Sequence, residues 1–218
     1  MSSKFIIIRV LLFVLLVVGT TSAMIAQDND FATWTKFKVN HKIDSRFAVS
    51  GDLELRTEDD MGAIDRWGIS VGGDYRAFSF LKFEIGYETH YRNLGEIGWK
   101  FRHRYRIGAT ASFRYQWLKM SLRERFQQTF DRGESETRLR SQLKLGYAPQ
   151  KGIVSPYFSI EIYQSLDDAP FWRTARLRYR PGIEIDLTKR WSLDAFYCYQ
   201  YESSRGKHIA GVEVGYSF

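Results

Sequence analysis

Arginines recur at every second position in several segments of this 218-residue chain. The clearest run is 99–111, where arginines alternate with aromatic and aliphatic residues, and similar spacing returns at 118–125, 138–147 and 175–187. Because residues i and i+2 lie on one face of a β-strand, each run predicts a strand with one basic and one apolar face. The arginines in this pattern are Arg102, Arg104, Arg106, Arg123, Arg125, Arg138, Arg140, Arg176, Arg178 and Arg180.

Carboxylates occupy the same alternating positions, mostly in other segments. Since a guanidinium pairs with a carboxylate through two parallel hydrogen bonds, the two sets predict charge ladders that line a lumen. Such a lumen is expected to be packed and structural, as in small barrels. The alternative is a narrow porin-like channel whose arginine surplus favours small anionic solutes. The carboxylates are Asp52, Glu54, Asp74, Glu84, Glu88, Glu161, Glu184, Asp186 and Asp194.

Residues suited to catalysis are sparse. The histidines are His41, His90, His103 and His208, and none adjoins a serine in a pattern typical of a nucleophile and its base. His90 and Glu88 share one face of a predicted strand, although a polar pair inside a lumen explains them more simply. An outer-membrane lipid-modifying enzyme is therefore the second alternative, with no catalytic residue and no cofactor predicted.

Metal and nucleic-acid sites are also poorly supported. Cys198 is the single cysteine, which excludes an intrachain disulfide and Cys-x-x-Cys metal sites. The acidic residues Glu58, Asp59, Asp60 and Asp65 match no calcium motif, so we expect a solvated loop and no metal. The arginines are predicted to face a lumen rather than an exposed groove-sized surface, which argues against nucleic acid as a partner.

The composition is typical of one exported barrel. A mean hydropathy of −0.35 is too polar for a helical membrane protein, whereas a barrel shows lipid only every second residue. The net charge of +7 indicates anionic partners or pairing within the fold, and we favour pairing. Lys4 and Arg9 precede an apolar run at 10–18 that is shorter than the roughly 20 residues of a membrane-spanning helix. The sequence thus predicts a cleavable signal peptide at 1–26 and a barrel at 27–218.

The alternating segments predict an all-β, antiparallel transmembrane β-barrel of about 10–12 strands. Eleven segments can be counted, whereas bacterial single-chain barrels have even numbers, so the role of the first, at 31–40, stays open. Short periplasmic turns are expected at 41–46, 78–81, 114–117, 148–155 and 187–191. Longer, more polar loops are expected at 57–66, 92–98, 131–136, 165–173 and 203–207.

A secreted β-sandwich or a lipocalin-like barrel would also alternate, with its apolar face inward. Three features favour the membrane barrel. The apolar phase is almost free of charge, it carries aromatic residues such as Trp67, Trp99 and Tyr147 toward strand ends, and the other phase is dense in arginine. We therefore expect integral insertion in an outer membrane, with its lipid as a partner.

The last segment, 208–218, alternates to its final residue and places Tyr216 and Phe218 on the apolar face. Residues 211–218 and four other segments resemble the domain-of-unknown-function 2490 family of outer-membrane barrels: 31–35, 53–56, 101–106 and 122–126. The resemblance covers most of the chain after residue 26 and implies an outer-membrane barrel fold. It also implies that the terminal strand closes the barrel and is bound by the barrel assembly machinery. It implies no activity.

Overall fold

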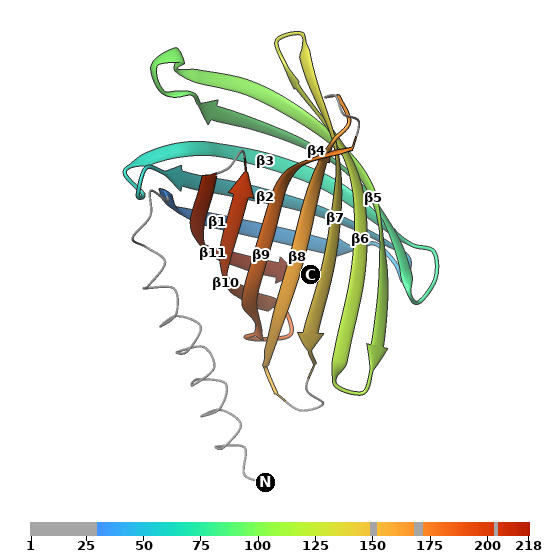
Figure 1. Ribbon diagram of the computed structural model, residues 1–218. Helices are drawn as coiled ribbons and strands as arrows, with labels where there is room; N and C mark the ends of the chain where they lie inside the picture. Colours follow the sequence, from blue (N-terminus) through green and yellow to red (C-terminus); the bar gives the residue numbers. More distant parts are fainter. Residues whose placement is uncertain (1–29, 149–151, 168–171, 203–204) are drawn as a thin grey trace.

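The structure is a computed structural model that describes residues 30–148, 152–167, 172–202 and 205–218 (Figure 1). The predicted signal peptide lies outside the described residues. Within the described parts, eleven β-strands form one closed barrel in the order β1-β11-β10-β9-β8-β7-β6-β5-β4-β3-β2. The predicted all-β barrel is confirmed, and its strand number falls within the predicted range.

The strands are long for a globular protein, and one short 3₁₀ helix, η1 (Gly95–Ile97), precedes β5. Their bounds are β1 (Asp30–Lys42), β2 (Phe47–Glu58), β3 (Ala63–Arg76), β4 (Leu81–Asn93), β5 (Trp99–Tyr115), β6 (Leu118–Asp131), β7 (Glu134–Tyr147), β8 (Val154–Ser165), β9 (Arg173–Asp186), β10 (Trp191–Glu202) and β11 (Arg205–Ser217).

The barrel closes through a parallel pair. β1 runs beside β11 in the same direction, with Asp30 opposite Lys207 and Asn40 opposite Ser217. The other neighbouring pairs of described strands are antiparallel. Consecutive strands alternate in direction, so an odd number makes the first and last strands run the same way. The segment whose role stayed open is therefore a full wall strand.

The connections are short at both ends of the barrel, so the predicted difference in length is wrong. We call the end with connections 43–46 and 77–80 the turn end, and the end with 59–62, 94–98 and 132–133 the loop end. Polar residues expected in loops extend the ladder instead, because strand pairing continues up to Asp131 opposite Glu134. In Figure 1 the hairpins after β4 and β6, in green and yellow, project beyond neighbouring strands.

The outer face of the barrel is apolar and uncovered. Leu53 is 54% exposed, Ile85 65% and Ile107 58%, although each lies in the middle of its strand. A sandwich or lipocalin-like barrel would bury this phase, so that alternative fails. No helix among the described residues is long and apolar enough to span a membrane.

Among the described residues, one small apolar cluster lies inside the barrel, beside the β1–β11 seam. It consists of Ala32, Phe196, Cys198 and Ile209, with Trp34 packed against it. Cys198 and Ile209 are fully buried. The rest of the interior is polar, so the fold turns its charged phase inward and leaves its apolar phase outside.

Candidate functional site

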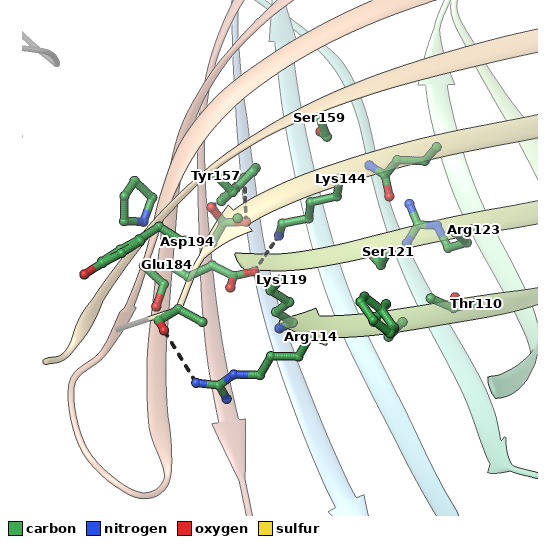
Figure 2. A pocket seen from close by; sticks show the side chains of 18 of the residues that line it. Thr110, Arg114, Lys119, Ser121, Arg123, Lys144, Tyr157, Ser159, Glu184 and Asp194 are labelled. Atoms are coloured by element: carbon green, nitrogen blue, oxygen red, sulfur yellow. Dashed lines mark hydrogen bonds and ion pairs between the residues drawn. The ribbon is translucent and has the colours of Figure 1, made fainter. Parts of the chain in front are cut away.

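Three cavities lined by described residues of the lumen share part of their lining. A turn-end vestibule of about 920 Å³ is lined by residues such as Arg114, Lys144 and Tyr157 (Figure 2). A loop-end vestibule of about 520 Å³ is lined by Asp65 and Arg102, among others. Between them lies a smaller cavity of about 220 Å³, which we call the waist. Because the waist shares side chains with both vestibules, the three form a polar interior that runs from one end to the other.

The waist is strongly cationic. Among the described residues that line it are thirteen basic side chains and only four carboxylates. The vestibules are closer to balance, with six basic and five acidic residues at the turn end and nine and six at the loop end. The charged residues of the waist are Lys36, Lys38, Arg56, Arg66, Arg104, Arg106, Arg123, Arg125, Arg138, Arg140, Arg176, Arg178 and Arg180, with Asp52, Glu54, Glu161 and Glu213.

Glu161 on β8 is shared by three arginines. Its Oε1 lies 2.6 Å from Arg140 Nη2 and 3.5 Å from Arg123 Nη2. Its Oε2 accepts hydrogen bonds from Arg178 at 3.3 Å and from the Tyr163 hydroxyl at 2.8 Å. The residue is only 4% exposed, so three positive charges depend on one buried carboxylate.

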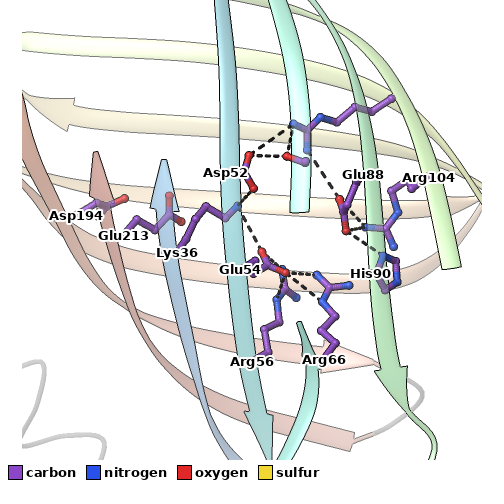
Figure 3. Close-up of polar contacts among 12 residues, drawn as sticks. Lys36, Asp52, Glu54, Arg56, Arg66, Glu88, His90, Arg104, Asp194 and Glu213 are labelled. Atoms are coloured by element: carbon purple, nitrogen blue, oxygen red, sulfur yellow. Dashed lines mark hydrogen bonds and ion pairs between the residues drawn. The ribbon is translucent and has the colours of Figure 1, made fainter. Parts of the chain in front are cut away.

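A second group of ion pairs lies on β1 to β5 (Figure 3). Glu54 accepts from Arg66 at 2.7 Å and from Arg56 at 2.9 Å, and Lys36 Nζ lies 3.4 Å from it. Figure 3 shows Glu88 between Arg104, at 3.2 Å, and His90, also at 3.2 Å.

His90 is 2% exposed and belongs to this network through its contact with Glu88. In the described part of the chain, no group of three or more His, Cys, Asp or Glu is arranged to hold a metal ion. The acidic turn considered for calcium instead caps β1, since Asp60 accepts a hydrogen bond from the Phe31 amide at 3.1 Å.

Among the described arginines that line the waist, Arg106 is the one most weakly paired with carboxylate. Its nearest carboxylate oxygens are those of Glu88 at 3.8 Å and Asp52 at 3.9 Å, and it donates to Ser70 at 3.2 Å. Its side chain lies across Gly86, where an added Cβ would be 2.3 Å from Arg106 Nε. The missing side chain at Gly86 therefore lets Arg106 lie along the wall.

The remaining predicted arginines pair along one strand, across neighbouring strands, or across one intervening strand, as Arg125 of β6 does with Glu84 of β4. Arg102 lies 2.8 Å from Asp131, Arg125 2.5 Å from Glu84, and Arg176 2.7 Å from Glu202. Arg138 pairs with Glu136 at the loop end. Arg180 Nη2 bridges Asp194 at 2.8 Å and Glu213 at 3.0 Å.

Three predicted carboxylates lie toward the turn end. Glu184 pairs with Lys144 at 2.5 Å and Asp74 with Lys82 at 3.2 Å. Asp186 lines the turn-end vestibule with Glu184. These residues thus lie apart from the cationic waist.

Aromatic side chains inside the lumen were not predicted as site residues. Arg56 lies 3.8 Å from the ring centre of Trp34, and Arg180 lies 3.5 Å from that of Phe196. Lys144 lies 3.6 Å from the ring centre of Tyr157. Such cation–π contacts hold cationic groups against the wall. The period-2 alternation of β1 could have identified Trp34, because it places Trp34 on the same face as Lys36 and Lys38. These two lysines were also not predicted as site residues.

The terminal strand joins the first at the turn end. The Phe218 amide donates to Asn40 O at 3.1 Å, and His41 Nδ1 lies 3.3 Å from Phe218 O. The Tyr216 ring lies 4.8 Å from that of Trp191 and 5.8 Å from that of Phe218. These contacts place both predicted terminal aromatics on the outer side of the closed seam.

Comparison with known proteins identifies a family and a structural likeness among solved structures. No curated protein matches the chain. Among solved structures, the translocator domain of the autotransporter NalP from Neisseria meningitidis is similar, with 16% identity and a TM-score of 0.49 over 78% of this chain and 73% of that chain. The family model described as "Protein of unknown function (DUF2490)" matches residues 31–209. Since this match spans most of the sequence, the chain belongs to the DUF2490 family.

Proposed function

We propose that this protein is an integral outer-membrane barrel whose lumen is a narrow path for small anions. The observation that carries the proposal is the charge of the waist, where thirteen basic side chains face four carboxylates. Channels select ions by rings of charged side chains at a constriction, and arginine rings favour anions.

The membrane assignment follows from the outer face. A closed barrel leaves no unpaired strand edge, which a lipid environment requires. The exposed side chains of Leu53, Ile69, Ile85, Ile107 and Leu122 need an apolar solvent, and lipid supplies it. We assign the turn end to the periplasm and the seam strand β11 to recognition by the assembly machinery.

The path follows from the order of the cavities. An anion entering either vestibule meets charge that is closer to balance than in the waist, and then a constriction with a strong positive surplus. Charges of one sign that line a low-dielectric passage raise the local concentration of the opposite ion. Cations would be repelled at the same point, so the waist is expected to set both the selectivity and the resistance.

A closed structural barrel is the second candidate. It is favoured by the cross-strand contacts around Glu161, which joins side chains from β6, β7 and β9. If these contacts fill the waist completely, the lumen is a packed interior and the outer loops become the working surface. A lipid-modifying enzyme has less support, since His90 is buried inside the lumen, away from the lipid face.

The test is single-channel recording in a planar bilayer with a potassium chloride gradient across it. Stable current steps whose reversal potential lies close to the equilibrium potential of chloride support the anion path. Cation preference would reject it, and silence from protein that migrates as a folded, heat-modifiable species would favour the closed barrel. Arg106→Gln should reduce chloride preference, whereas Arg114→Gln, at the mouth of the turn-end vestibule, should change it less.

A further inference from the structure

We infer that one wall of the waist holds a built site for a phosphate group. The site is the set of five arginines around Gln127, which we call the arginine ring: Arg104, Arg106, Arg125, Arg138 and Arg140. All five and Gln127 line the waist. This site would give the proposed function a defined class of anion. It rests on the proposed function only because an anion must reach the waist through a vestibule.

Strand register places the ring around Gln127. On β6, Gln127 lies opposite Arg106 of β5 and opposite Arg138 of β7. Arg125 is two residues away on the same strand and lies opposite Arg140. Arg104 is the diagonal neighbour on β5, opposite Thr129. Direct neighbours on one face have Cβ atoms roughly 5 Å apart and diagonal ones roughly 7–8 Å, within reach of long side chains.

The carboxylates that neutralise the ring stand outside it. Arg104 and Arg125 turn toward Glu88 and Glu84 on β4. Arg138 pairs with Glu136 near the loop end, and Arg140 pairs with Glu161 on β8. At the centre is the neutral amide of Gln127, which is only 6% exposed.

The ring has more positive charge and more donors than its surroundings match. Arg125 and Arg140 are direct cross-strand neighbours of like charge, which destabilises a sheet. Arg106 has no carboxylate oxygen closer than 3.8 Å among the described residues. The Nε atoms of Arg138 and Arg140 are buried and have no hydrogen-bond partner among the described residues. A bound anion at the centre would relieve this imbalance.

Phosphate fits this arrangement better than chloride does. A guanidinium presents parallel N–H donors that match two oxygens of one phosphate, and each such pair is charge-assisted. A phosphate dianion offers several acceptor oxygens and two charges to a ring of five arginines. Chloride offers one charge and no directional acceptor, so it would pass the ring without being held.

The test is isothermal titration calorimetry of the folded protein in detergent with inorganic phosphate, at pH 8 and constant ionic strength in chloride. One phosphate is expected to bind per barrel. The decisive variant is Gln127→Glu, which places a carboxylate at the centre of the ring. It should fold at least as stably as wild type and bind phosphate about tenfold more weakly or worse, because the site is already occupied by charge.

Gln142→Glu is the matched control. Gln142 also lines the waist, so this change adds the same charge to the same cavity, but the residue lies opposite Arg123 and Glu161 rather than inside the ring. It should bind phosphate with nearly wild-type affinity. Equal losses in both variants would mean diffuse attraction to a basic lumen and would overturn the site, as would the absence of binding by folded wild type.

A second titration, with glycerol 3-phosphate, identifies the source of the phosphate group. Competition at equal or higher affinity points to phosphomonoester solutes, and much weaker binding points to free phosphate. The two proposals fail separately. Chloride conductance without phosphate binding would contradict only the phosphate site. Phosphate binding by a barrel that passes no current would contradict only the anion path.

Discussion

Individual residues in this barrel matter mainly for how they pair charges inside the lumen and how much space they leave there. Glu161 gathers three arginines on one carboxylate, while Arg106 has no close carboxylate and rests against a glycine. The first arrangement stabilises the wall, and in the proposed anion path the second keeps the passage clear. Both can be tested by changing one side chain.

Replacing Glu161 with glutamine should strongly destabilise the barrel. The change leaves Arg123, Arg140 and Arg178 without their shared negative charge, and unpaired buried charges cost about 3–5 kcal/mol. Denaturant unfolding in detergent measures the loss. Glu184→Gln is the control, because the Glu184 side chain is 41% exposed and its pair with Lys144 should be worth about 1 kcal/mol or less. Similar losses for both variants would show that Glu161 is not a shared anchor.

Replacing Gly86 with alanine should narrow the waist. The new methyl group would overlap Arg106 and push its guanidinium toward the lumen axis, at a strain of about 1–3 kcal/mol. Single-channel conductance should fall while the protein still folds. In Gly73→Ala the new Cβ meets only Ile85, at an ordinary 3.7 Å on the outer face, so its conductance should match wild type. An unchanged conductance in Gly86→Ala would mean that Arg106 does not border the path.

At the scale of elements, the turns and the seam determine whether the strands close. The turn at 43–46 is held by Asp44, whose Oδ1 accepts hydrogen bonds from the Arg46 amide at 2.6 Å and the Phe47 amide at 2.7 Å. The seam is held by the inner apolar cluster around Ile209. The Asp44 turn is polar and exposed, whereas the cluster at the seam is apolar and buried. The turn should therefore respond to pH, and the seam to the loss of buried apolar volume.

The turn at Asp44 should lose its contribution in acid. Hydrogen bonds from the Phe47 and Arg46 amides lower the pKa of the Asp44 carboxyl below its ordinary value. The folded state therefore gains stability above the ordinary carboxyl pKa and loses it as pH falls through the lower folded value. Asp44→Ala should lower the unfolding midpoint at pH 7 and match wild type in strong acid.

Thr188→Ala is the control for Asp44, because Thr188 Oγ1 accepts from the Arg190 and Trp191 amides at 3.2 and 3.0 Å without titrating. Its effect on the unfolding midpoint should be the same at both pH values. If the Asp44→Ala deficit also persisted in strong acid, the turn would not depend on the ionised carboxylate.

The seam should depend on Ile209. It is fully buried beside Ala32 and Cys198, so Ile209→Ala leaves a cavity that should cost about 2–5 kcal/mol of unfolding free energy. Val212→Ala, three residues along β11 on the outer face and 42% exposed, should cost clearly less. Denaturant unfolding, followed by the heat-modifiable gel shift, compares the two. Equal costs would mean that the inner cluster does not hold the parallel pair.

For the whole molecule, charge is sorted by depth rather than spread evenly. The vestibules are near balance and the waist is basic, while the outer face is apolar. In the proposed anion path, this distribution of charge attracts anions over a distance set by ionic screening. Its selectivity is therefore a property of the complete barrel and of the solution around it.

Selectivity should weaken as salt concentration rises. The screening length is about 10 Å at 0.1 M and about 3 Å at 1 M, so the waist influences fewer ions in concentrated salt. Reversal potentials at a fixed gradient should give a larger chloride-to-potassium permeability ratio in dilute than in concentrated salt. A ratio independent of salt would point to selection by size or by a tightly held site.

The amino-acid sequence alone was enough to predict the strands, their two faces and the closed barrel, because alternation is local and period 2 assigns each side chain to a face. Arg102, Arg104 and Arg106 could be placed on one face without any knowledge of their neighbours. The odd number of strands could also be counted from the sequence, but the parallel pairing of the first and last strands that follows from it was not predicted.

The way in which the strands meet could be learned only from the folded barrel. The parallel closure of β1 on β11, the pairing of Arg102 with Asp131, and the ring around Gln127 all depend on register between strands. Register is set by turn lengths and by packing across the seam, and a shift of a residue or two would give every arginine a different partner. For that reason the charges could be read from the chain, whereas their surplus at the waist could not.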